Sequence, residues 1–346
     1  MKVLHIIPSM EIGGAQKLLS DLLLLQMKQA DVTLLVFRSV KNALVDKLVE
    51  AGVKIVSLDV KNVYNPLVIF RLKKYIKGYD VVHVHLFPAL YWVAFASRGV
   101  EGRLVYTEHS TSNSRRGKRW LLPLERMVYG KYSEVISISP QTQTALNGWL
   151  GRECSREVIL NGIDVEAFAR AASGVQPSDS IVMVSRFASS KDQETVIRAM
   201  SYIDPDVRLR FVGDGPLLAK NIALAESLGL SHRIDFIGAA DDVAKYIAAA
   251  KVGVQSSHWE GFGLTAVEIM ACGRPVVASD VPGLKQVVEG AGVLFQYGDY
   301  EGLAKAVNSL FADEQLYLQT AGRCAERAAE FDIKKAAEGY RRVYNG

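Results

Sequence analysis

The amino-acid sequence predicts an α/β protein with two doubly wound parallel sheets. Segments of strand length that are rich in Val and Ile alternate with longer segments whose apolar residues recur at helical spacing. Strands that are apolar along their whole length, with helices between them, indicate a parallel sheet covered on both faces. The alternation stops at a small, polar stretch near residues 165–180 and then begins again. We therefore predict two domains, each with its own sheet.

The predicted strands form two sets of six. The first set is KVLHIIP (2–8), DVTLLVF (31–37), VKIVSLD (53–59), DVVHVHLF (80–87), RLVYTEHS (103–110) and EVISISP (134–140). The second set is SIVMVSRF (180–187), VRLRFVGDG (207–215), RIDFIGA (233–239), VGVQSS (252–257), RPVVAS (274–279) and GVLFQ (292–296). We place the first domain at residues 1–166, a linker at 167–180, the second domain at 181–328 and a final helix at 329–346. Ligands of doubly wound sheets bind beyond the carboxyl ends of the strands, so the site is expected in a cleft between the domains.

The composition argues against a membrane-spanning or disulfide-stabilised protein. The chain has 346 residues, 49% of them hydrophobic, but no apolar run approaches the roughly 20 residues that a bilayer crossing needs. The initial segment MKVLHIIPSM fits a buried first strand better than a secretory signal. Three widely spaced cysteines form neither a disulfide framework nor a pair of zinc ligands. We expect a cytoplasmic protein.

Basic residues are concentrated in the first half of the chain. Residues 1–173 contain 23 Lys and Arg against 15 Asp and Glu, and residues 174–346 contain 18 against 22, which suggests an anionic partner for the first half. One segment combines basic side chains with an apolar run: Arg115, Arg116, Lys118, Arg119 and Trp120. We expect it to contact the anionic inner face of a membrane, and the alternative is a solvated loop before a core helix. Nucleic acid is not expected as a partner, because no recognition motif accompanies the charge.

The segment HWEGFGLTAVEIMACGRPVVASDVPG (258–283) contains two glutamates on either side of a glycine-rich turn. The Gly-Phe-Gly turn should follow a strand and lead into a helix that begins near Leu264. Glycines let a ligand approach the backbone, and the free N–H groups of a helix N-terminus bind phosphate. Glu268 would then meet ribose hydroxyls, and Glu260 would meet a sugar. The segment predicts a nucleotide-sugar site, although the helix dipole alone favours an acid in the first turn and such a turn also serves packing.

These residues resemble the donor-binding signature of the retaining glycosyltransferases of family four, in which two glutamates separated by seven residues flank Gly-Phe-Gly. The resemblance covers nearly the whole chain: IGGAQKLL, VYTEHS, VILNGIDVEAF and VSRFASSKDQETVIRAM are similar to further motifs of the family. It implies the GT-B architecture, with two facing Rossmann-like domains and a C-terminal helix that crosses back to the first. Gln16 departs from the glutamate common in the family, which leaves a role for this position open.

The resemblance also implies the role of each site residue. Arg186 and Lys191 would stabilise the departing diphosphate, Glu268 would bind ribose, and Glu260 and His109 would orient the sugar. The implied catalytic residues are His109, Arg186, Lys191 and Glu260. The implied donor-binding residues are Gly13, Gly14, Gly238, Gly261, Phe262, Gly263, Leu264, Thr265 and Glu268.

Neither a metal nor another cofactor is predicted. Cleavage of a nucleotide sugar leaves negative charge on the diphosphate, which a cation must stabilise. Asp-Pro-Asp at residues 204–206 has the composition of a turn rather than of a metal site. His83 and His85 have no third ligand at suitable spacing, so we expect buried, hydrogen-bonded histidines. Arg186 and Lys191, together with a helix N-terminus, would take the place of a metal.

The sequence, with this resemblance, predicts a hexosyltransferase that moves a sugar from a nucleoside-diphosphate sugar to an acceptor hydroxyl with retention of configuration. UDP- and GDP-sugars are the favoured donors. The basic, partly apolar segment favours a glycan or lipid-linked acceptor of cell-surface polysaccharide synthesis. No residue is identified as a covalent nucleophile, which favours a front-face displacement. Two alternatives stay open: a sugar-nucleotide epimerase of the same fold, and a non-catalytic nucleotide-sugar-binding partner of another transferase.

Overall fold

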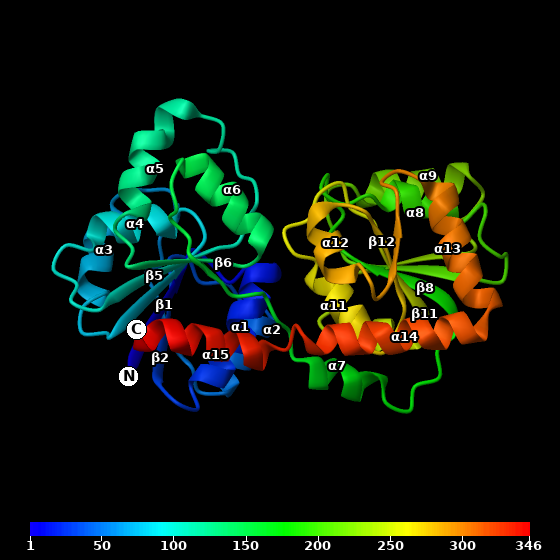
Figure 1. The fold of residues 1–346 in the computed structure, drawn as a ribbon, viewed down its shortest axis with the longest axis horizontal. Helices are drawn as coiled ribbons and strands as arrows, with labels where there is room; N and C mark the ends of the chain where they lie inside the picture. Colours follow the sequence, from blue (N-terminus) through cyan, green and yellow to red (C-terminus); the bar gives the residue numbers. More distant parts are fainter. The chain divides into compact units, whose positions relative to one another are not determined.

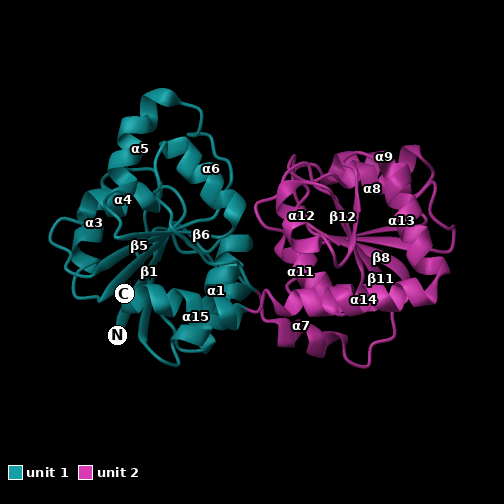
Figure 2. Ribbon diagram, viewed as in Figure 1, with its two compact units in different colours: residues 1–162, 333–346 teal, residues 163–332 magenta.

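The computed structural model describes residues 1–346, which divide into two compact units (Figure 1, Figure 2). Unit 1 comprises residues 1–162 and 333–346, and unit 2 comprises residues 163–332. Each unit contains one parallel sheet, so the predicted α/β class with two doubly wound sheets is confirmed. None of the helices combines the length and the apolar character that a membrane crossing requires.

The sheet of unit 1 has seven parallel strands in the order β3-β2-β1-β4-β5-β6-β7. The strands are β1 (Lys2–Ile7), β2 (Asp31–Val36), β3 (Lys54–Ser57), β4 (Val81–His85), β5 (Arg103–Glu108), β6 (Glu134–Ser137) and β7 (Glu157–Val158). The first six are the predicted strands, and β7 is too short to give a periodic signal. The chain proceeds outward from β1 in one direction and from β4 in the other. Ligands of such sheets bind where the strand order reverses, at the carboxyl ends of β1 and β4.

Helices cover both faces of this sheet (Figure 1). They are α1 (Gly14–Gln26), α2 (Ala43–Glu50), α3 (Val68–Tyr75), α4 (Ala89–Ala96), α5 (Leu122–Tyr129), α6 (Pro140–Leu150) and α15 (Ile333–Asn345), with a 3₁₀ turn at Arg119–Leu121. Alternate strand residues point to opposite faces. Val3, Val81 and Val105 therefore pack with α1 and α15, whereas their neighbours Leu4 and Val82 pack with α3 to α6. The last helix of the chain thus belongs to unit 1 and lies against α1.

The sheet of unit 2 has six parallel strands in the order β10-β9-β8-β11-β12-β13. They are β8 (Ser178–Val184), β9 (Arg208–Val212), β10 (Ile234–Gly238), β11 (Ala250–Gln255), β12 (Val276–Ser279) and β13 (Val293–Phe295). The helices are α7 (Val165–Ala172), α8 (Gln193–Ala199), α9 (Leu218–Ser227), α10 (Ala244–Ala249), α11 (Leu264–Ala271), α12 (Pro282–Val288), α13 (Tyr300–Ala312) and α14 (Glu314–Ala329). All six strands correspond to predicted ones. Residues 204–206 form the predicted turn, in which the Asp204 carboxylate accepts a hydrogen bond from the Asp206 amide at 2.9 Å.

The stretch expected as a linker, residues 167–180, is structured and belongs to unit 2. Asp164 caps α7 by accepting a hydrogen bond from the Ala167 amide at 2.9 Å, and Phe168 is buried. Helix α7 packs against α10 and α11, and β8 begins at residue 178. Small and polar residues suggested a linker there. A capping Asp and one large apolar side chain are enough to hold a short helix on the core.

Candidate functional site

In unit 2, parallel strands bring the main predicted segments to one edge of the sheet. Strands β8 and β11 are neighbours, so the loops that follow them, residues 185–192 and 256–263, lie side by side. The amide of His258 donates a hydrogen bond to the carbonyl of Ser190 at 2.9 Å and joins the two loops. The loop with the two predicted cations is thereby fixed against the loop with Glu260.

Lys191 and Glu260 form an ion pair. The Nζ atom of Lys191 hydrogen-bonds to Oε2 of Glu260, and it lies 3.4 Å from the hydroxyl oxygen of Ser257. The two side chains are only 18% and 21% exposed, so water screens this pair less than a surface pair. The sequence predicted a role for each residue but not their direct contact. An anionic group and a hydroxyl group of one ligand can be bound side by side at such a pair.

Arg186 lies in the same loop as Lys191. Its side chain is exposed, and its guanidinium forms no hydrogen bond or ion pair within the chain. The backbone around it is tightly packed: a Cβ at Gly213 would lie 2.1 Å from the Ser185 carbonyl oxygen, and a Cβ at Gly215 would lie 2.4 Å from that of Phe187. Both glycines also have positive φ angles, 143° and 155°. They let the loop after β9 support the Arg186 loop, while the cation itself stays available to a ligand.

Helix α11 begins directly after the Gly-Phe-Gly turn, as predicted. Its N-cap, Gly263, has a φ of 95° and supplies no side-chain cap, and the first turn contains no acidic residue. The first amides, at Leu264 and Thr265, have no helical partner four residues back. The Glu260 side chain lies beside this turn, with its Cγ 3.8 Å from the position of a Cβ on Gly263. The helix N-terminus therefore offers free donors and positive dipole charge next to the Lys191–Glu260 pair.

Glu268 and Phe262 lie deeper than the sequence suggested. Glu268 is on the buried face of α11 and is 3% exposed. The Phe262 ring is also buried and packs edge-to-face on Phe331, with 5.5 Å between the ring centroids. The Phe262 ring thus belongs to the core of unit 2, and the implied part of this position in donor binding remains a prediction. Contact of Glu268 with ribose remains a prediction.

Two further glycines shape this edge. Gly283, near the start of α12, had no predicted role. A Cβ on Gly283 would lie 2.2 Å from the Glu260 carbonyl oxygen. The absence of a side chain at Gly283 therefore allows the Glu260 backbone to lie at its observed position. The Pro-Gly pair that follows β12 indicates a helix start, but no local signal shows that Glu260 is the neighbour. Gly238 ends β10 at the same edge with a φ of 80°, and its carbonyl accepts a hydrogen bond from the Gly213 amide at 2.7 Å.

A cavity of about 480 Å³ opens beside the Lys191 loop. Its lining includes Lys191, Lys220, His258 and Tyr297. Cavities of this size hold small-molecule ligands, and this one combines cationic and aromatic side chains. Residues of the Lys191 loop, of α8, of α9 and of the loop after β13 line it, so Lys191 is the member of the ion pair that faces this cavity.

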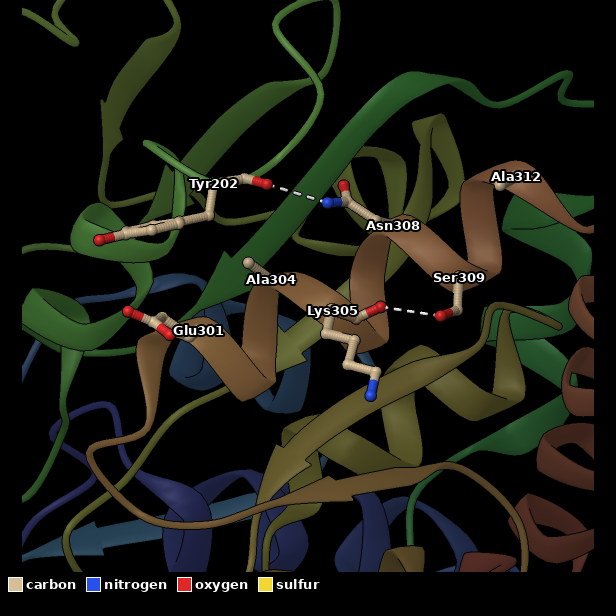
Figure 3. A pocket seen from close by; sticks show the side chains of 7 residues that line it. All are labelled: Tyr202, Glu301, Ala304, Lys305, Asn308, Ser309 and Ala312. Carbon is tan, nitrogen blue, oxygen red and sulfur yellow. Dashed lines mark hydrogen bonds between the residues drawn. The ribbon is translucent and has the colours of Figure 1, made fainter.

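Another hollow, of about 440 Å³, lies over α13 and is shown in Figure 3. The side chains of Asn308 and Ser309 point there to backbone carbonyls of Tyr202 and Lys305, each at 2.9 Å. These polar groups are therefore satisfied within the chain. None of the predicted site residues lines this hollow, and we assign it no function.

In unit 1, Gly13 and Gly14 begin helix α1. Gly13 is the N-cap, again without a side-chain cap, and the first turn has no acidic residue. A Cβ on Gly13 would lie 2.7 Å from Oε1 of Gln16, whose Nε2 donates to the Ser9 carbonyl at 3.4 Å. Gln16 thus acts within this loop, and the amides of the first helical turn stay available to a ligand.

His109 follows strand β5 directly. Its Nε2 lies 3.2 Å from Nδ1 of His85, whereas its Nδ1 is buried and has no hydrogen-bond partner in the chain. Burial lowers the pKa of His109 from 6.5 to about 4. The imidazole is therefore neutral near pH 7, so it offers a hydrogen bond and not a positive charge.

His109 adjoins a cluster of three fully buried histidines. The sequence suggested no third partner for His83 and His85, but His5 lies opposite His83 on the neighbouring strand β1. The nitrogens of these three rings approach within 4.8 Å of one another, as ligands of a metal ion could. Every one of these nitrogens already has a hydrogen-bond partner. The prediction of buried, hydrogen-bonded histidines is confirmed, with His5 as the member that sequence spacing could not reveal.

This cluster predicts a loss of stability in mild acid. Burial lowers the pKa of His5 and His109 to about 4 and that of His83 and His85 well below 6.5. Below pH 6.5 the unfolded chain therefore binds protons that the folded chain does not, and folding stability falls as the pH falls towards 4. We expect each such histidine to lower the free energy of unfolding by up to about 1.4 kcal/mol per pH unit in this window.

Urea unfolding at pH 7.5 and pH 5.5 checks this expectation, since most carboxylates keep their charge at both values. Replacing the buried His5 by Asn should make the difference smaller. Replacing the exposed His232 of unit 2 by Gln should leave it unchanged. Equal stability of the wild-type protein at the two pH values would contradict the account of the cluster.

The basic segment before α5 is partly turned inward. The Arg115 Nε atom lies 2.9 Å from Oε1 of Glu125, and its guanidinium covers the Phe87 ring at 4.3 Å. Arg116 pairs with Glu108 at 3.3 Å. Buried carboxylates of unit 1 thus bind both guanidinium groups, and the predicted contact of these arginines with a membrane remains a prediction. Lys118, Arg119 and Trp120 are exposed, the last at 76%.

Each of the two units matches a known protein family. Residues 12–167 match the family described as Glycosyltransferase Family 4, and residues 166–331 match the family described as Glycosyl transferases group 1. Together the two matches extend from residue 12 to residue 331 of the chain.

Known proteins resemble the chain over different lengths. An N-acetyl-alpha-D-glucosaminyl L-malate synthase of Bacillus anthracis is 32% identical over 177 residues, which are 49% of this chain and 46% of that enzyme. The chain thus aligns with under half of that relative. A phosphatidyl-myo-inositol mannosyltransferase of Mycolicibacterium smegmatis is 27% identical over 81% of this chain and 75% of its own. The crystal structure of Anabaena Alr3699/HepE with UDP-glucose has a TM-score of 0.87 at 25% identity and covers 100% of this chain and 99% of its own.

Proposed function

The chain belongs to the glycosyltransferases of group 1 and family 4, with two Rossmann-like domains and a GT-B fold, and from this premise we propose its reaction. It transfers a hexose from a nucleoside-diphosphate sugar, UDP-hexose first among the candidates and GDP-hexose second, with retention of configuration. The acceptor is a hydroxyl of a glycan or lipid-linked intermediate in cell-surface polysaccharide synthesis. The solved structure with UDP-glucose supports the donor class. The mannosyltransferase relative, named for a phosphatidyl-inositol, supports a lipid-linked acceptor.

The observation that carries this proposal is the uncapped N-terminus of α11 beside the Lys191–Glu260 pair. Helix amides, a largely buried ammonium and an exposed guanidinium lie on two adjacent loops of one sheet edge. This set is suited to a diphosphate. The helix amides and the planar guanidinium of Arg186 donate directed hydrogen bonds to phosphate oxygens, and the Lys191 ammonium supplies a compact positive charge. Glu260, beside them, is suited to the hydroxyls of the attached sugar.

The proposed reaction needs no covalent enzyme intermediate. The bond between the anomeric carbon and the diphosphate oxygen breaks while the acceptor oxygen attacks from the same face. The diphosphate oxygen that departs takes the proton of the acceptor hydroxyl. Lys191, Arg186 and the amides of Leu264 and Thr265 stabilise the charge on the leaving group, which replaces a metal ion in this account. Glu260 steadies the sugar as positive charge develops on its ring, and Glu268 binds the ribose.

A donor screen followed by a product assay tests the proposal. We expect UDP- or GDP-sugars to raise the melting temperature more than ADP-sugars, and one of them to be consumed only when an acceptor is added. NMR of the anomeric proton of the product should show the configuration of the donor. An isomerised sugar nucleotide formed from donor alone would favour an epimerase. A donor that binds but is never consumed with glycan or lipid-linked acceptors would favour a non-catalytic binding protein.

We further propose that the exposed segment of Lys118, Arg119 and Trp120 contacts anionic lipid. Two basic side chains stand next to a Trp that is 76% exposed, and Met127 on the following helix is exposed as well. Basic groups attract an anionic surface, and an indole ring partitions into the interface. The contact would hold the enzyme near a lipid-linked acceptor.

Flotation with vesicles of anionic lipid checks this contact. Replacing Lys118 and Arg119 by Glu is expected to weaken binding by about tenfold or more, since each basic residue near such a surface contributes about 1 kcal/mol. The matched control replaces the exposed Lys73 and Lys74 of α3 by Glu. Equal losses in both double variants would show a general charge effect and would contradict a specific contact.

A further inference from the structure

The buried histidines of unit 1 form a directed chain of hydrogen bonds that ends at His109. His5 lies on β1, His85 lies on β4 and His109 follows β5, all on the face covered by α1 and α15. Their rings are neutral because burial lowers each pKa. A neutral imidazole has one N–H donor and one acceptor nitrogen. One fixed ring therefore determines the tautomer of the next.

Gln26, at the end of α1, sets the direction of the chain. Its amide nitrogen donates to the Tyr344 hydroxyl at 3.4 Å, which turns its Oε1 towards Nε2 of His5 at 2.8 Å. An amide oxygen only accepts, so Nε2 of His5 bears the hydrogen and Nδ1 is an acceptor. That Nδ1 lies 3.1 Å from Nε2 of His85, which must therefore be the donor.

The hydrogen bond between His85 and His109 determines the tautomer of His109. Nδ1 of His85, which has no hydrogen, accepts from Nε2 of His109 at 3.2 Å. The hydrogen of His109 is thus on Nε2, and Nδ1 has a lone pair. This Nδ1 is buried and has no hydrogen-bond partner in the chain. A buried polar atom without a partner is costly, and a ligand that donates a hydrogen bond removes the cost.

A second branch of hydrogen bonds holds Gln26 in this orientation. The Tyr344 hydroxyl, on α15, accepts from Gln26 and donates to Nδ1 of His83 at 2.5 Å. Nε2 of His83 then donates to the Thr107 hydroxyl at 2.7 Å. In this branch the hydrogens of Gln26, Tyr344 and His83 each meet an acceptor, so these directions are consistent with those of the chain to His109. The last helix of the chain takes part through Tyr344.

We propose that Gln26, His5 and His85 are positioning residues that fix His109 in the Nε2–H tautomer, so that its Nδ1 accepts a hydrogen bond from a sugar hydroxyl of the substrate. The inference rests on the proposed function for the identity of the substrate. It also defines the chemistry that His109 recognises. A lone pair repels the oxygens of a phosphate, whereas a hydroxyl can donate to it. His109 therefore selects a hydroxyl group and takes no part in binding the diphosphate.

NMR of protein with ¹⁵N-labelled histidine tests the tautomer without any substrate. We expect Nε2 of His109 to be of the protonated, pyrrole type and Nδ1 of the unprotonated, pyridine type. Added UDP-glucose should shift the Nδ1 signal, as a new hydrogen bond would. A hydrogen on Nδ1 of His109 in the wild-type protein overturns the inference, whether or not the protein transfers sugar.

Variants at the far end of the chain separate positioning from structural support. Gln26→Leu should give a mixture of His109 tautomers and lower kcat by about three- to tenfold, the effect of one misdirected hydrogen bond. Gln26→Glu keeps an oxygen facing His5 and should restore a single tautomer. The matched control, Ser137→Ala, removes a buried hydrogen bond of unit 1 to Ser155 that lies outside the histidine cluster, and it should leave the tautomer unchanged. An unchanged His109 spectrum in Gln26→Leu also overturns the inference.

The tautomer of His109 and the transfer of sugar are tested by different results. A correct tautomer with no transfer from any sugar nucleotide would remove the proposed function and leave the hydrogen-bond chain in place. Sugar transfer with equal rates and equal His109 spectra in all variants would support the proposed function and contradict the positioning role of the hydrogen-bond chain. The melting temperature of each variant shows that the comparison is made on folded protein.

Discussion

Replacement of Lys191 by alanine is expected to reduce kcat by about 100- to 1000-fold, the usual effect of removing one group that stabilises transition-state charge. The ammonium lies beside an uncapped helix N-terminus and is only 18% exposed, so its charge acts on the leaving diphosphate with little screening. The KM for the donor should rise much less, because the charge on the leaving oxygen develops during the reaction. Initial rates at saturating donor measure the effect.

A double variant separates this role from a structural one. Lys191→Ala leaves the Glu260 carboxylate without its cationic partner, which could by itself disturb the site. If pairing with Glu260 were the only role of Lys191, Lys191→Ala would cause no further loss of kcat in a Glu260→Gln background. We expect a further loss of kcat in that background as well, because the diphosphate still lacks its cation. Lys220→Ala, which removes another lysine from the lining of the same cavity, is the control and should stay within about threefold of the wild type.

Replacement of Gly283 by alanine is expected to reduce activity by about 100-fold through displacement of Glu260. Gly283 is helical, so the change should favour α12 by about 1 kcal/mol on propensity alone. The new methyl group, however, would meet the Glu260 carbonyl oxygen at 2.2 Å and the carbonyl carbon at 2.6 Å. The loop must move, and a shift of about 1 Å at a reacting group costs about two orders of magnitude in rate. Overpacking should also lower the free energy of unfolding by about 1–3 kcal/mol.

Gly322→Ala is the matched control for Gly283→Ala. Gly322 is also helical, in α14 of the same unit, and a Cβ there would meet nothing within 4 Å. That variant should be slightly stabilised and fully active. A Gly283→Ala protein as active and stable as Gly322→Ala would show that the position of the Glu260 backbone is not critical.

The sequence predicts the fold of both units well because their signals are local. Each strand is a short run in which apolar residues predominate, and each sheet is parallel because helices separate consecutive strands. The start of α11 at Leu264 is predictable for the same reason, since the glycine turn directly precedes it. Helix α7 is missed because a single buried Phe168 gives no periodic pattern in a polar stretch.

The candidate site is predictable only as a set of positions. Spacing indicates Lys191 and Glu260 separately. Their ion pair depends on the adjacency of β8 and β11 in the sheet, because the two residues are 69 positions apart along the chain. His5 joins His83 only because β1 and β4 are neighbours in the sheet. Arg115 is indistinguishable in the sequence from its exposed neighbours until the buried Glu125 is placed beside it. Such features arise from tertiary contacts, which local patterns do not contain.

The proposed reaction requires the N-terminus of α11, with Lys191 and Arg186, to bind a diphosphate without a metal. A crystal structure of the protein with UDP, grown in the presence of Mn²⁺, tests it most directly. The account predicts diphosphate oxygens within hydrogen-bonding distance of the Leu264 and Thr265 amides and of Lys191 Nζ, with no ion between the phosphates. A diphosphate bound elsewhere, or a manganese ion that bridges its two phosphates, would contradict the account.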